Sequence, residues 1–335
     1  MVPLPHFNLP DMLARMSYKI FVDGQEGTTG LEISQRLAGR AELEILSIDS
    51  AKRKDPEERR KLINASDITF LCLPDVAARE SASLVDNDHS CLIDASTAHR
   101  TNPDWTYGIP ELDKMQRERI RQSRRIAVPG CHASGFVIPM APLVKGGIVP
   151  ADYPVSFCSL TGYSGGGKKL IQWYEEELAG DKSENAPRMY ALGLAHKHLP
   201  EVSYHTGLSR SPVFSPILAN IYKGMLVSIP LHVDMLKGVS HARDVHTFLE
   251  EHYRGEAFVR VQPFGGEGAL EEGYLQSMAC NDTNRLDLYV FGHETQVLLV
   301  SRLDNLGKGA SGAAVQCMNI KLGLEEGRGL EIDQG

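Results

Sequence analysis

What this sequence lacks excludes several classes of protein. Its 335 residues carry a formal net charge of −8 and contain no block of basic residues, so we do not expect it to bind nucleic acid. No apolar run is long enough to span a bilayer, and we expect no association with a membrane. Residues 1–15 lack the apolar core of a signal peptide, and we interpret them as an N-terminal extension before the first strand.

The cysteines are few and isolated. There are six, and none of them belongs to a CxxC pair, so the pattern predicts neither a disulfide framework nor a zinc finger. Several of them lie within apolar, strand-like runs. We therefore expect a reduced cytoplasmic protein without a metal cofactor. The six positions are Cys72, Cys91, Cys131, Cys158, Cys280 and Cys317.

The first part of the chain alternates between predicted strands and helices. Hydrophobic residues make up 42% of the sequence, enough for a large core, and the length predicts about two domains. Repeated strand–helix units favour a doubly wound α/β fold with a parallel sheet. The predicted elements are strands at Tyr18–Asp23, Leu43–Ile48, Ile68–Leu73 and Cys91–Asp94, with the first helix at Leu31–Leu37.

After residue 150 the pattern changes, and several strands follow one another. This order favours a mostly antiparallel sheet with one face covered by helices. The predicted strands are Val155–Leu160, Met225–Pro230, Tyr274–Cys280, Leu286–Phe291 and Gln296–Leu303; the predicted helices are Leu170–Leu178, Ala242–Tyr253 and one ending near Ile320–Leu322.

A glycine-rich loop directly follows the first predicted strand. Gly24, Gly27 and Gly30 are spaced as GxxGxxG, with Thr28 and Thr29 between them. A loop between a strand and a helix allows backbone N–H groups to approach a pyrophosphate. The spacing differs from GxGxxG, so the loop is either a dinucleotide site or a plain turn.

The end of the second predicted strand bears on the choice of cofactor. An acidic residue at this position binds a ribose 2′-hydroxyl, whereas a nearby arginine suits a 2′-phosphate. Asp49 offers the first chemistry, and Ser50 and Arg53 offer the second. We favour NADP over NAD, provided that Asp49 points away; the alternative is a solvated charged turn.

One cysteine follows a sharp turn and precedes an apolar helix. Arg125–Val128 reads as a strand, Pro129-Gly130 as a turn and Ala133–Val144 as a helix. Cys131 is therefore predicted at a helix N-terminus, where the dipole and free N–H groups favour an anion. Such a position lowers a thiol pKa and raises its nucleophilicity. The alternative is an inert, buried cysteine.

A second glycine-rich segment resembles a P-loop only in part. Gly162 to Lys168 fits GxxxxGK, but Lys169 stands where the magnesium-binding hydroxyl is required, so we reject an ATPase. The loop can still receive a phosphate or carboxylate on its amides. Ser164 and Lys168 would add a hydroxyl and a charge.

Two histidines precede a Leu-Pro-Glu turn. His196 and His198 would share one face if this segment is extended. Zinc ligation is conceivable, but no third ligand with familiar spacing is near. Either histidine is a candidate proton donor and acceptor for Cys131, and Glu201 could orient an imidazole. A pair of surface histidines is the alternative.

Seven segments together resemble the N-acetyl-gamma-glutamyl-phosphate reductases of the shorter bacterial type. They occur in the expected order from about residue 18 to about residue 325, and the ordered set is more specific than any one segment. The chain departs from the longer members at 97–99 and has Lys168 where arginine is common. The segments are Gly24–Gly30, Leu92–Arg100 with Tyr107–Leu112, Pro129–Cys131, Ser164–Lys168, His196–Glu201 and Asn305–Ala310.

The resemblance implies a fold related to the glyceraldehyde-phosphate and aspartate-semialdehyde dehydrogenases. Residues 16–135 and 300–335 would form a Rossmann-like NADP-binding domain, and residues 136–299 an α+β catalytic and oligomerisation domain. A homodimer or homotetramer is expected, with a small-molecule substrate and inorganic phosphate as ligands. Among cofactor-binding residues the resemblance adds Pro74, Gly165, Gly166 and Asn305, and among substrate-binding residues Ser96, Arg100 and Glu201 beside Ser164 and Lys168.

It also implies a reaction, in which Cys131 attacks the acyl phosphate of N-acetyl-L-glutamyl 5-phosphate and forms a thioester. NADPH then reduces the thioester to the 5-semialdehyde, in arginine biosynthesis. A thioester accepts hydride far better than a carboxylate, and amides at the start of the helix would stabilise the oxyanion. His198 is the first choice for the acid/base and His196 the second. Arg100 could clamp a carboxylate or phosphate, and Tyr107 and Glu111 are weaker candidates.

Three alternatives remain open. One is a sister reductase that acts on aspartyl phosphate or a carrier-bound aminoadipyl phosphate, which a panel of substrates would distinguish. Another is a Cys–His acyl hydrolase or transferase, which would leave the loop at Gly24–Gly30 without a role. The third is a non-enzymatic NADP sensor, which would not need a reactive Cys131.

Overall fold

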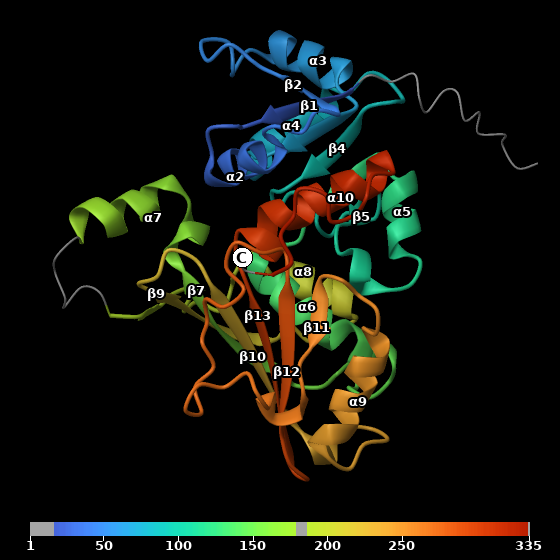
Figure 1. Cartoon of the computed structure of the whole chain (residues 1–335), viewed down its shortest axis with the longest axis vertical. Coiled ribbons are helices and arrows are strands. Elements are labelled where there is room, and N and C mark those ends of the chain that lie inside the picture. The colour runs from blue at the N-terminus through green and yellow to red at the C-terminus, as the bar shows by residue number, and fades with distance from the viewer. Residues whose placement is uncertain (1–16, 179–185, 334–335) are drawn as a thin grey trace, which may run out of the picture.

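The computed structural model describes residues 17–178 and 186–333, and these residues form two β-sheets (Figure 1). The predicted extension at 1–15 lies outside the described residues. The first sheet has six parallel strands in the order β2-β1-β3-β4-β6-β5. This confirms the predicted doubly wound α/β fold. The strands are β1 (Tyr18–Asp23), β2 (Leu43–Leu46), β3 (Ile68–Leu71), β4 (Cys91–Asp94), β5 (Thr106–Tyr107) and β6 (Arg125–Ala127).

Helices connect these strands, and the ends of two strands and one helix differ from those predicted from the sequence. The second and third strands stop two residues before the predicted ends, at Leu46 and Leu71. The first helix begins at Thr28 rather than Leu31, because Gly27 already serves as its N-cap. The helices are α2 (Thr28–Leu37), α3 (Pro56–Ala65), α4 (Asp75–Ser83) and α5 (Gln116–Gln122).

The strand order creates a crevice at one edge of this sheet. The chain leaves β1 for β2 on one side and then returns to β3 on the other side. In open parallel sheets, ligands bind at such a switch point, beyond the carboxyl ends of the strands. The loops that follow β1 and β3 lie at this point, and the glycine loop predicted from the sequence is one of them.

The second sheet has seven strands in the order β11-β12-β13-β10-β7-β9-β8. Four of its six strand pairings are antiparallel, as the sequence predicted. The strands are β7 (Ser156–Gly162), β8 (Arg188–Met189), β9 (Val213–Ala219), β10 (Met225–His232), β11 (Val259–Val261), β12 (Leu286–Gly292) and β13 (Gln296–Leu303).

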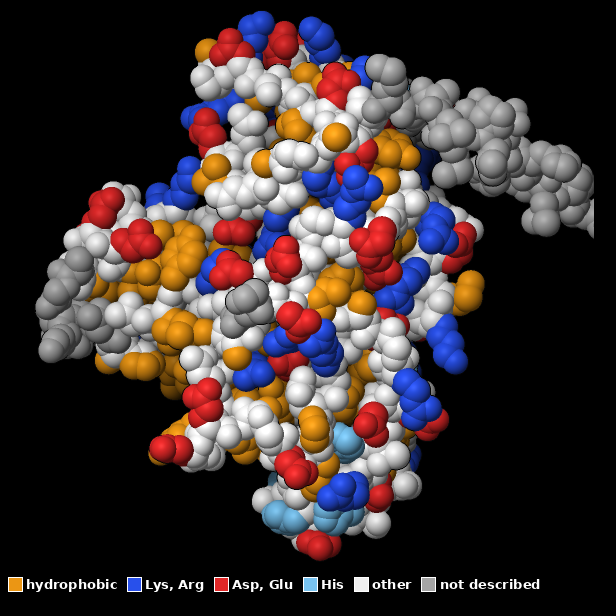
Figure 2. All heavy atoms as spheres, viewed as in Figure 1, with side chains coloured by type: hydrophobic (Ala, Val, Ile, Leu, Met, Phe, Trp, Pro, Cys, Tyr) orange, Lys and Arg blue, Asp and Glu red, His pale blue; other side chains and the backbone are white. Residues whose placement is uncertain are grey.

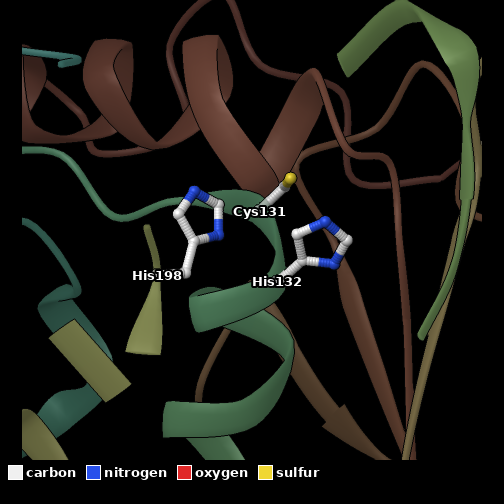
Figure 3. A group of neighbouring side chains, drawn as sticks. All are labelled: Cys131, His132 and His198. Atoms are coloured by element: carbon white, nitrogen blue, oxygen red, sulfur yellow. The ribbon is translucent and has the colours of Figure 1, made fainter. Parts of the chain in front are cut away.

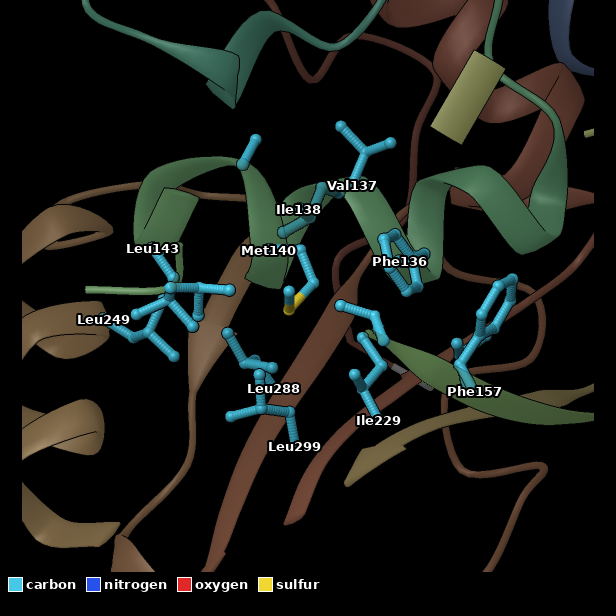
Figure 4. Packing of buried hydrophobic residues seen from close by; sticks show 14 of the residues in the cluster. Phe136, Val137, Ile138, Met140, Leu143, Phe157, Ile229, Leu249, Leu288 and Leu299 are labelled. Atoms are coloured by element: carbon cyan, nitrogen blue, oxygen red, sulfur yellow. The ribbon is translucent and has the colours of Figure 1, made fainter. Parts of the chain in front are cut away.

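One face of this sheet is covered by helices α6 (Cys131–Lys145), α8 (Leu199–Thr206) and α9 (Ala242–His252). Figure 4 shows Phe136 and Met140 of α6 facing Ile229 and Leu299 of the sheet. Helix α6 is apolar on nearly all sides and almost wholly buried, because β10 and β13 of this sheet pack on one side of it and α8, α9 and the turn at Gly307–Ser311 pack on its other sides. That burial fixes the helix whose first residue is Cys131.

One sequence prediction in this half is wrong, and a predicted helix has a different form. Residues 274–280 do not form a strand: Tyr274 makes one isolated antiparallel bridge to Glu271 across a turn at Gly273, whose φ is 86°, and residues 277–280 form turns, where the Gln276 side chain accepts the backbone N–H of Met278. The helix predicted at 170–178 is a short α7 (Lys168–Gln172) followed by a π-helical turn at Trp173–Glu177. Short 3₁₀ turns lie at Pro110–Leu112, Tyr163–Gly166, Val233–Met235 and Phe264–Gly266.

The C-terminal helix returns to the first sheet, as expected. A π-helical turn at Gly307–Ser311 leads into α10 (Gly312–Leu322), whose Val315 and Met318 pack in one cluster with Ile20. Within that turn, the buried Lys308 ammonium donates to both carboxylate oxygens of Glu111, at 2.7 and 2.9 Å. No helix among the described residues is long and apolar enough to cross a membrane.

Candidate active site

The crevice between β1 and β3 is a cavity of about 280 Å³, and glycines bring backbone segments close together beside it. A Cβ on Gly24 would lie 2.4 Å from the carbonyl oxygen of Cys72, and one on Gly30 would lie 2.4 Å from the carbonyl oxygen of Gly24. Gly24 also has a φ of 90°, a left-handed value that favours glycine. These close contacts bring the start of α2 up to the cavity.

The residues present fit a dinucleotide. Gly27 caps α2 without a side-chain hydrogen bond, so backbone N–H groups at this end are free to receive a phosphate. The buried hydroxyl of Thr28 has no hydrogen-bond partner among the described residues, although buried polar groups normally have one. A pyrophosphate would accept hydrogen bonds both from these N–H groups and from the Thr28 hydroxyl. Gly27 and Thr29 line the neighbouring cleft as well.

Three residues that follow β2 lie at this cavity. Ser50, Arg53 and Lys54 line the cavity, and Arg53 forms an exposed ion pair with Glu26. Asp49 does not line the cavity, because its carboxylate accepts the backbone N–H of Ala51 at 2.9 Å.

Pro74, by contrast, lines neither cavity. It is the N-cap residue of α4, directly after Cys72 and Leu73.

The second cavity, a cleft of about 800 Å³, contains Cys131 and adjoins the first. Gly27 and Cys72 line both cavities, and the cleft extends from them to Cys131 and His198. A ligand that lies along the crevice therefore has its far end beside the cysteine.

Cys131 is the first residue of α6, as predicted, and glycines bring the chain against it. A Cβ on Gly309 would lie 2.7 Å from the Cβ of Cys131, and one on Gly130 would lie 2.4 Å from the His198 ring. Only glycine permits this approach of the turn before α10 on one side and of His198 on the other. Figure 3 shows Cys131 between the rings of His198 and His132.

His198 and His196 lie beside Cys131, but not on an extended segment. They belong to a turn in which His198 caps α8, and their ring centroids are 4.8 Å apart in an edge-on arrangement. His198 is buried, and its Nδ1 has no hydrogen-bond partner among the described residues. The Cys131 sulfur and a ring nitrogen of His198 lie within 4.8 Å of each other.

His132 is a site residue that the sequence reasoning missed. Its Nδ1 lies 2.6 Å from the Ser159 hydroxyl and its Nε2 lies 2.8 Å from the Tyr190 hydroxyl. Its position next to Cys131 in the chain was the signal that could have revealed it. Cysteine and histidine are zinc ligands, but both nitrogens of His132 are already bonded, so the trio of Cys131, His132 and His198 offers only two free ligand atoms.

The expected lowering of the thiol pKa is wrong for this structure. Burial raises the pKa of Cys131 to about 11, although Arg100 and the His132 backbone N–H act in the opposite direction. Burial disfavours the charged form of a thiol more strongly here than the helix N-terminus favours it. The thiol is therefore protonated at neutral pH until another group takes its proton.

The histidines are in a state to take that proton. Burial lowers the pKa of His196 to about 4 and that of His132 to about 3. Burial, and next Arg100, hold the pKa of His198 well below its usual value. All three imidazoles are neutral at pH 7, and a neutral ring has one nitrogen that accepts a proton.

Glu201 has a different role from the one expected. It does not orient a histidine; its carboxylate accepts from Arg100 at 3.0 Å, from the Tyr107 hydroxyl at 2.7 Å and from the backbone N–H of Gly130 at 2.9 Å. It is buried and does not line the cleft. Through Gly130 it fixes the residue that precedes the nucleophile.

Arg100 lines the cleft, but much of its guanidinium is already bonded. Besides Glu201 it donates to the carbonyl oxygen of Val128 at 2.9 Å and to that of Ala95 at 3.0 Å. Three protein acceptors therefore hold the group that was predicted as a substrate clamp.

The other predicted ligand residues divide into two groups. Ser164, Gly165, Gly166, Lys168 and Asn305 line the cleft, and the Asn305 side chain donates to the Ser164 hydroxyl at 2.9 Å. Ser96 does not line the cleft, because its hydroxyl donates to Asp94 at 2.8 Å. Glu111 contacts Lys308 and Gln316 instead of the cleft.

The fold and the matching family models show that the protein is of the semialdehyde dehydrogenase class. A family model described as the semialdehyde dehydrogenase NAD-binding domain matches residues 19–123, and one described as the semialdehyde dehydrogenase dimerisation domain matches residues 131–305. The structure is similar to aspartate semialdehyde dehydrogenase II from Vibrio cholerae (TM-score 0.66, 14% identity, 91% of this chain and 98% of that one). It is also similar to the Francisella tularensis enzyme (TM-score 0.68, 14% identity, 90% and 99%).

Within that class, three curated relatives of the chain are reductases of one kind. The chain is 46% identical to N-acetyl-gamma-glutamyl-phosphate reductase 2 from Nostoc sp. over 93% of its length and 99% of that protein. It is 46% identical to the Pseudomonas putida reductase 2 (92% and 98%) and to the Brucella ovis reductase (92% and 100%). The chain belongs to the N-acetyl-gamma-glutamyl-phosphate reductase family.

Proposed function

We propose that this chain reduces N-acetyl-L-glutamyl 5-phosphate to N-acetyl-L-glutamate 5-semialdehyde and inorganic phosphate with NADPH, in arginine biosynthesis in the cytoplasm. The names of its relatives support the substrate. The observation that carries the proposal is that the dinucleotide crevice adjoins the cleft in which a cysteine lies beside a neutral histidine.

Cys131 and His198 carry out the acyl transfer. His198 accepts the thiol proton, and the sulfur attacks the acyl carbon, so that a C–S bond forms as the C–O bond to phosphate breaks. Backbone N–H groups at the start of α6 stabilise the negative oxygen of the intermediate. Phosphate leaves, and a thioester remains on Cys131.

When bound, the nicotinamide supplies the hydride that reduces the thioester carbonyl. The C–S bond of the resulting thiohemiacetal then breaks, the semialdehyde leaves, and His198 returns its proton to the Cys131 thiolate. Because His196 lines the same cleft and is also neutral, it is the second choice for this proton transfer.

The residues at the end of β2 support a preference for NADP. Ser50, Arg53 and Lys54 line the cavity where the adenosine ribose would lie, and Asp49 is bonded to its own turn. Cationic and hydroxyl groups there suit a 2′-phosphate.

Substrate contacts and domains complete the proposal. Ser164 and Lys168 in the cleft are proposed ligands of the substrate, while Ser96 and Glu201 would support it indirectly through Asp94 and Gly130. We take residues 16–135 with 300–335 as the NADP-binding domain and 136–299 as the catalytic domain.

An oligomer is proposed through the second sheet. Its face opposite α6 exposes Leu298 and Val213 and half-buries Leu160 and Ile217, and Figure 2 shows hydrophobic side chains gathered over α7, β7 and β9. A second copy would cover this apolar face. Light scattering should give a dimer or tetramer; a monomer at micromolar concentration contradicts the proposal.

The test is the reverse reaction. N-acetylglutamate 5-semialdehyde should reduce NADP⁺ only when phosphate is present, and Cys131→Ser should abolish the activity. Folding of the variant is checked by its thermal unfolding. A folded wild type that fails with this substrate but oxidises aspartate 4-semialdehyde is a sister reductase, and equal activity in Cys131→Ser contradicts the mechanism.

A further inference from the structure

The cations of the catalytic cleft are not equivalent. Among the described residues that line it, three carry a permanent positive charge, namely Arg100, Lys168 and Lys197. Arg100 is 7% exposed and already donates to three protein acceptors. An incoming anion therefore finds its most available charges on the two lysines.

Lys197 is the lysine that lies in the same turn as two histidines of the cleft. It lies between His196 and His198 in the turn that faces Cys131, and its side chain is exposed in the cleft. Its ammonium makes no hydrogen bond or ion pair with any described residue. A charge with no protein partner, next to the nucleophile, is free to bind a ligand.

The charge of Lys197 acts on Cys131 and on the histidines around it. Its charge contributes to lowering the pKa of the Cys131 thiol and the pKa values of His132, His196 and His198. Lys168, on the glycine loop at the other side of the same cleft, contributes to none of these four shifts. The two lysines therefore act on different parts of the cleft.

We propose that the Lys197 ammonium binds the phosphoryl group of the acyl phosphate and the inorganic phosphate of the reverse reaction, directly beside Cys131. This inference rests on the proposed acyl-phosphate chemistry and adds its phosphate-binding residue. Lys168 is left for the remote carboxylate end of the substrate. Nothing in the sequence pattern singled out Lys197, because the flanking histidines dominate the segment.

The placement suits both directions of the reaction. In the reductive direction the C–O bond breaks as the C–S bond forms, and the departing phosphate takes the electron pair that Lys197 stabilises. In the reverse direction a phosphate oxygen attacks the thioester carbon, the C–S bond breaks, and the electron pair returns to the Cys131 sulfur. A cation beside the sulfur positions the phosphate for each step.

A binding test needs neither cofactor nor organic substrate. Inorganic phosphate should slow the alkylation of Cys131 by iodoacetamide in the wild type, at matched ionic strength. The half-protecting phosphate concentration should rise about tenfold or more in Lys197→Met, remain near the wild-type value in Lys168→Met, and be restored largely in Lys197→Arg. Comparing rates with and without phosphate within each variant cancels any change in thiol reactivity.

Steady-state kinetics separates phosphate binding from carboxylate binding. Lys197→Met should raise the KM for phosphate about tenfold and leave the KM for the semialdehyde within about twofold. A rise in the semialdehyde KM alone, an equal loss of protection in Lys168→Met, or no phosphate protection of the wild type overturns the inference. If protection follows the expected pattern but another semialdehyde is the substrate, the substrate assignment fails while the role of Lys197 stands.

Discussion

The dinucleotide crevice and the catalytic cleft are both bounded by glycine turns, but they hold their charges in opposite ways. In the crevice, Arg53 and Glu26 pair at the surface, with side chains 49% and 52% exposed. In the cleft, Arg100 and Glu201 pair with side chains 7% and 2% exposed. Breaking the exposed pair to bind a ligand requires little free energy. Breaking the buried pair, which holds Arg100 and Glu201 in place, requires much more.

The first prediction breaks the buried pair and has the largest expected effect. Glu201→Ala leaves the Arg100 guanidinium buried without its counter-ion and removes the acceptor of Tyr107 and Gly130. We expect the free energy of unfolding to fall by about 3–5 kcal/mol, measured by urea denaturation of the holoenzyme. Glu201→Gln keeps an acceptor and serves as the matched control, with a smaller loss expected. A loss below about 1 kcal/mol in Glu201→Ala would mean that Arg100 reaches solvent.

The exposed crevice and the buried cleft also differ in how much of each could be predicted from the sequence. Most of the strands, the crevice and the position of Cys131 at a helix start are local patterns, and the structure has them, although residues 274–280 form no strand. The partners of Glu201 lie 71 to 101 residues away in the chain, so no local pattern could assign them. The thiol pKa was predicted in the wrong direction for the same reason, because burial is a tertiary property that outweighs the local helix N-terminus.

The second prediction concerns pH and the support beneath the cleft. His205 stacks on Tyr107 with ring centroids 3.4 Å apart, its Nε2 lies 2.6 Å from the carbonyl oxygen of Arg100, and burial lowers its pKa to about 4 from 6.5. The unfolded chain therefore binds a proton below about pH 6.5 that the folded chain does not. Stability is full above that pH and falls as the pH decreases towards 4.

Comparing His205→Phe with the wild type isolates this contribution. The phenyl ring can keep the stack on Tyr107 but does not titrate. Between pH 7.5 and 4.5, the variant should lose about 2 kcal/mol less of its unfolding free energy than the wild type, measured by urea denaturation at each pH. Equal losses in both proteins would show that His205 is not neutral in the folded state.

The third prediction acts on the exposed pair and has the smallest effect on stability. Arg53→Ala removes a surface ion pair, so the unfolding free energy should change by less than about 0.5 kcal/mol. The same change removes a cation from the cavity beside Ser50, and the KM for NADPH should rise about tenfold, while that for NADH stays nearly constant.

The matched control for this variant is Glu26→Gln, which frees Arg53 from its partner without removing its charge. Because Glu26 competes with an incoming 2′-phosphate for the guanidinium, this variant should lower the KM for NADPH about two- to threefold. If the KM for NADPH rises in Arg53→Ala and falls in Glu26→Gln, Arg53 exchanges Glu26 for the 2′-phosphate when the cofactor binds. Equal KM changes for NADPH and NADH in Arg53→Ala would instead mean that Arg53 shapes the crevice without reading the 2′-phosphate.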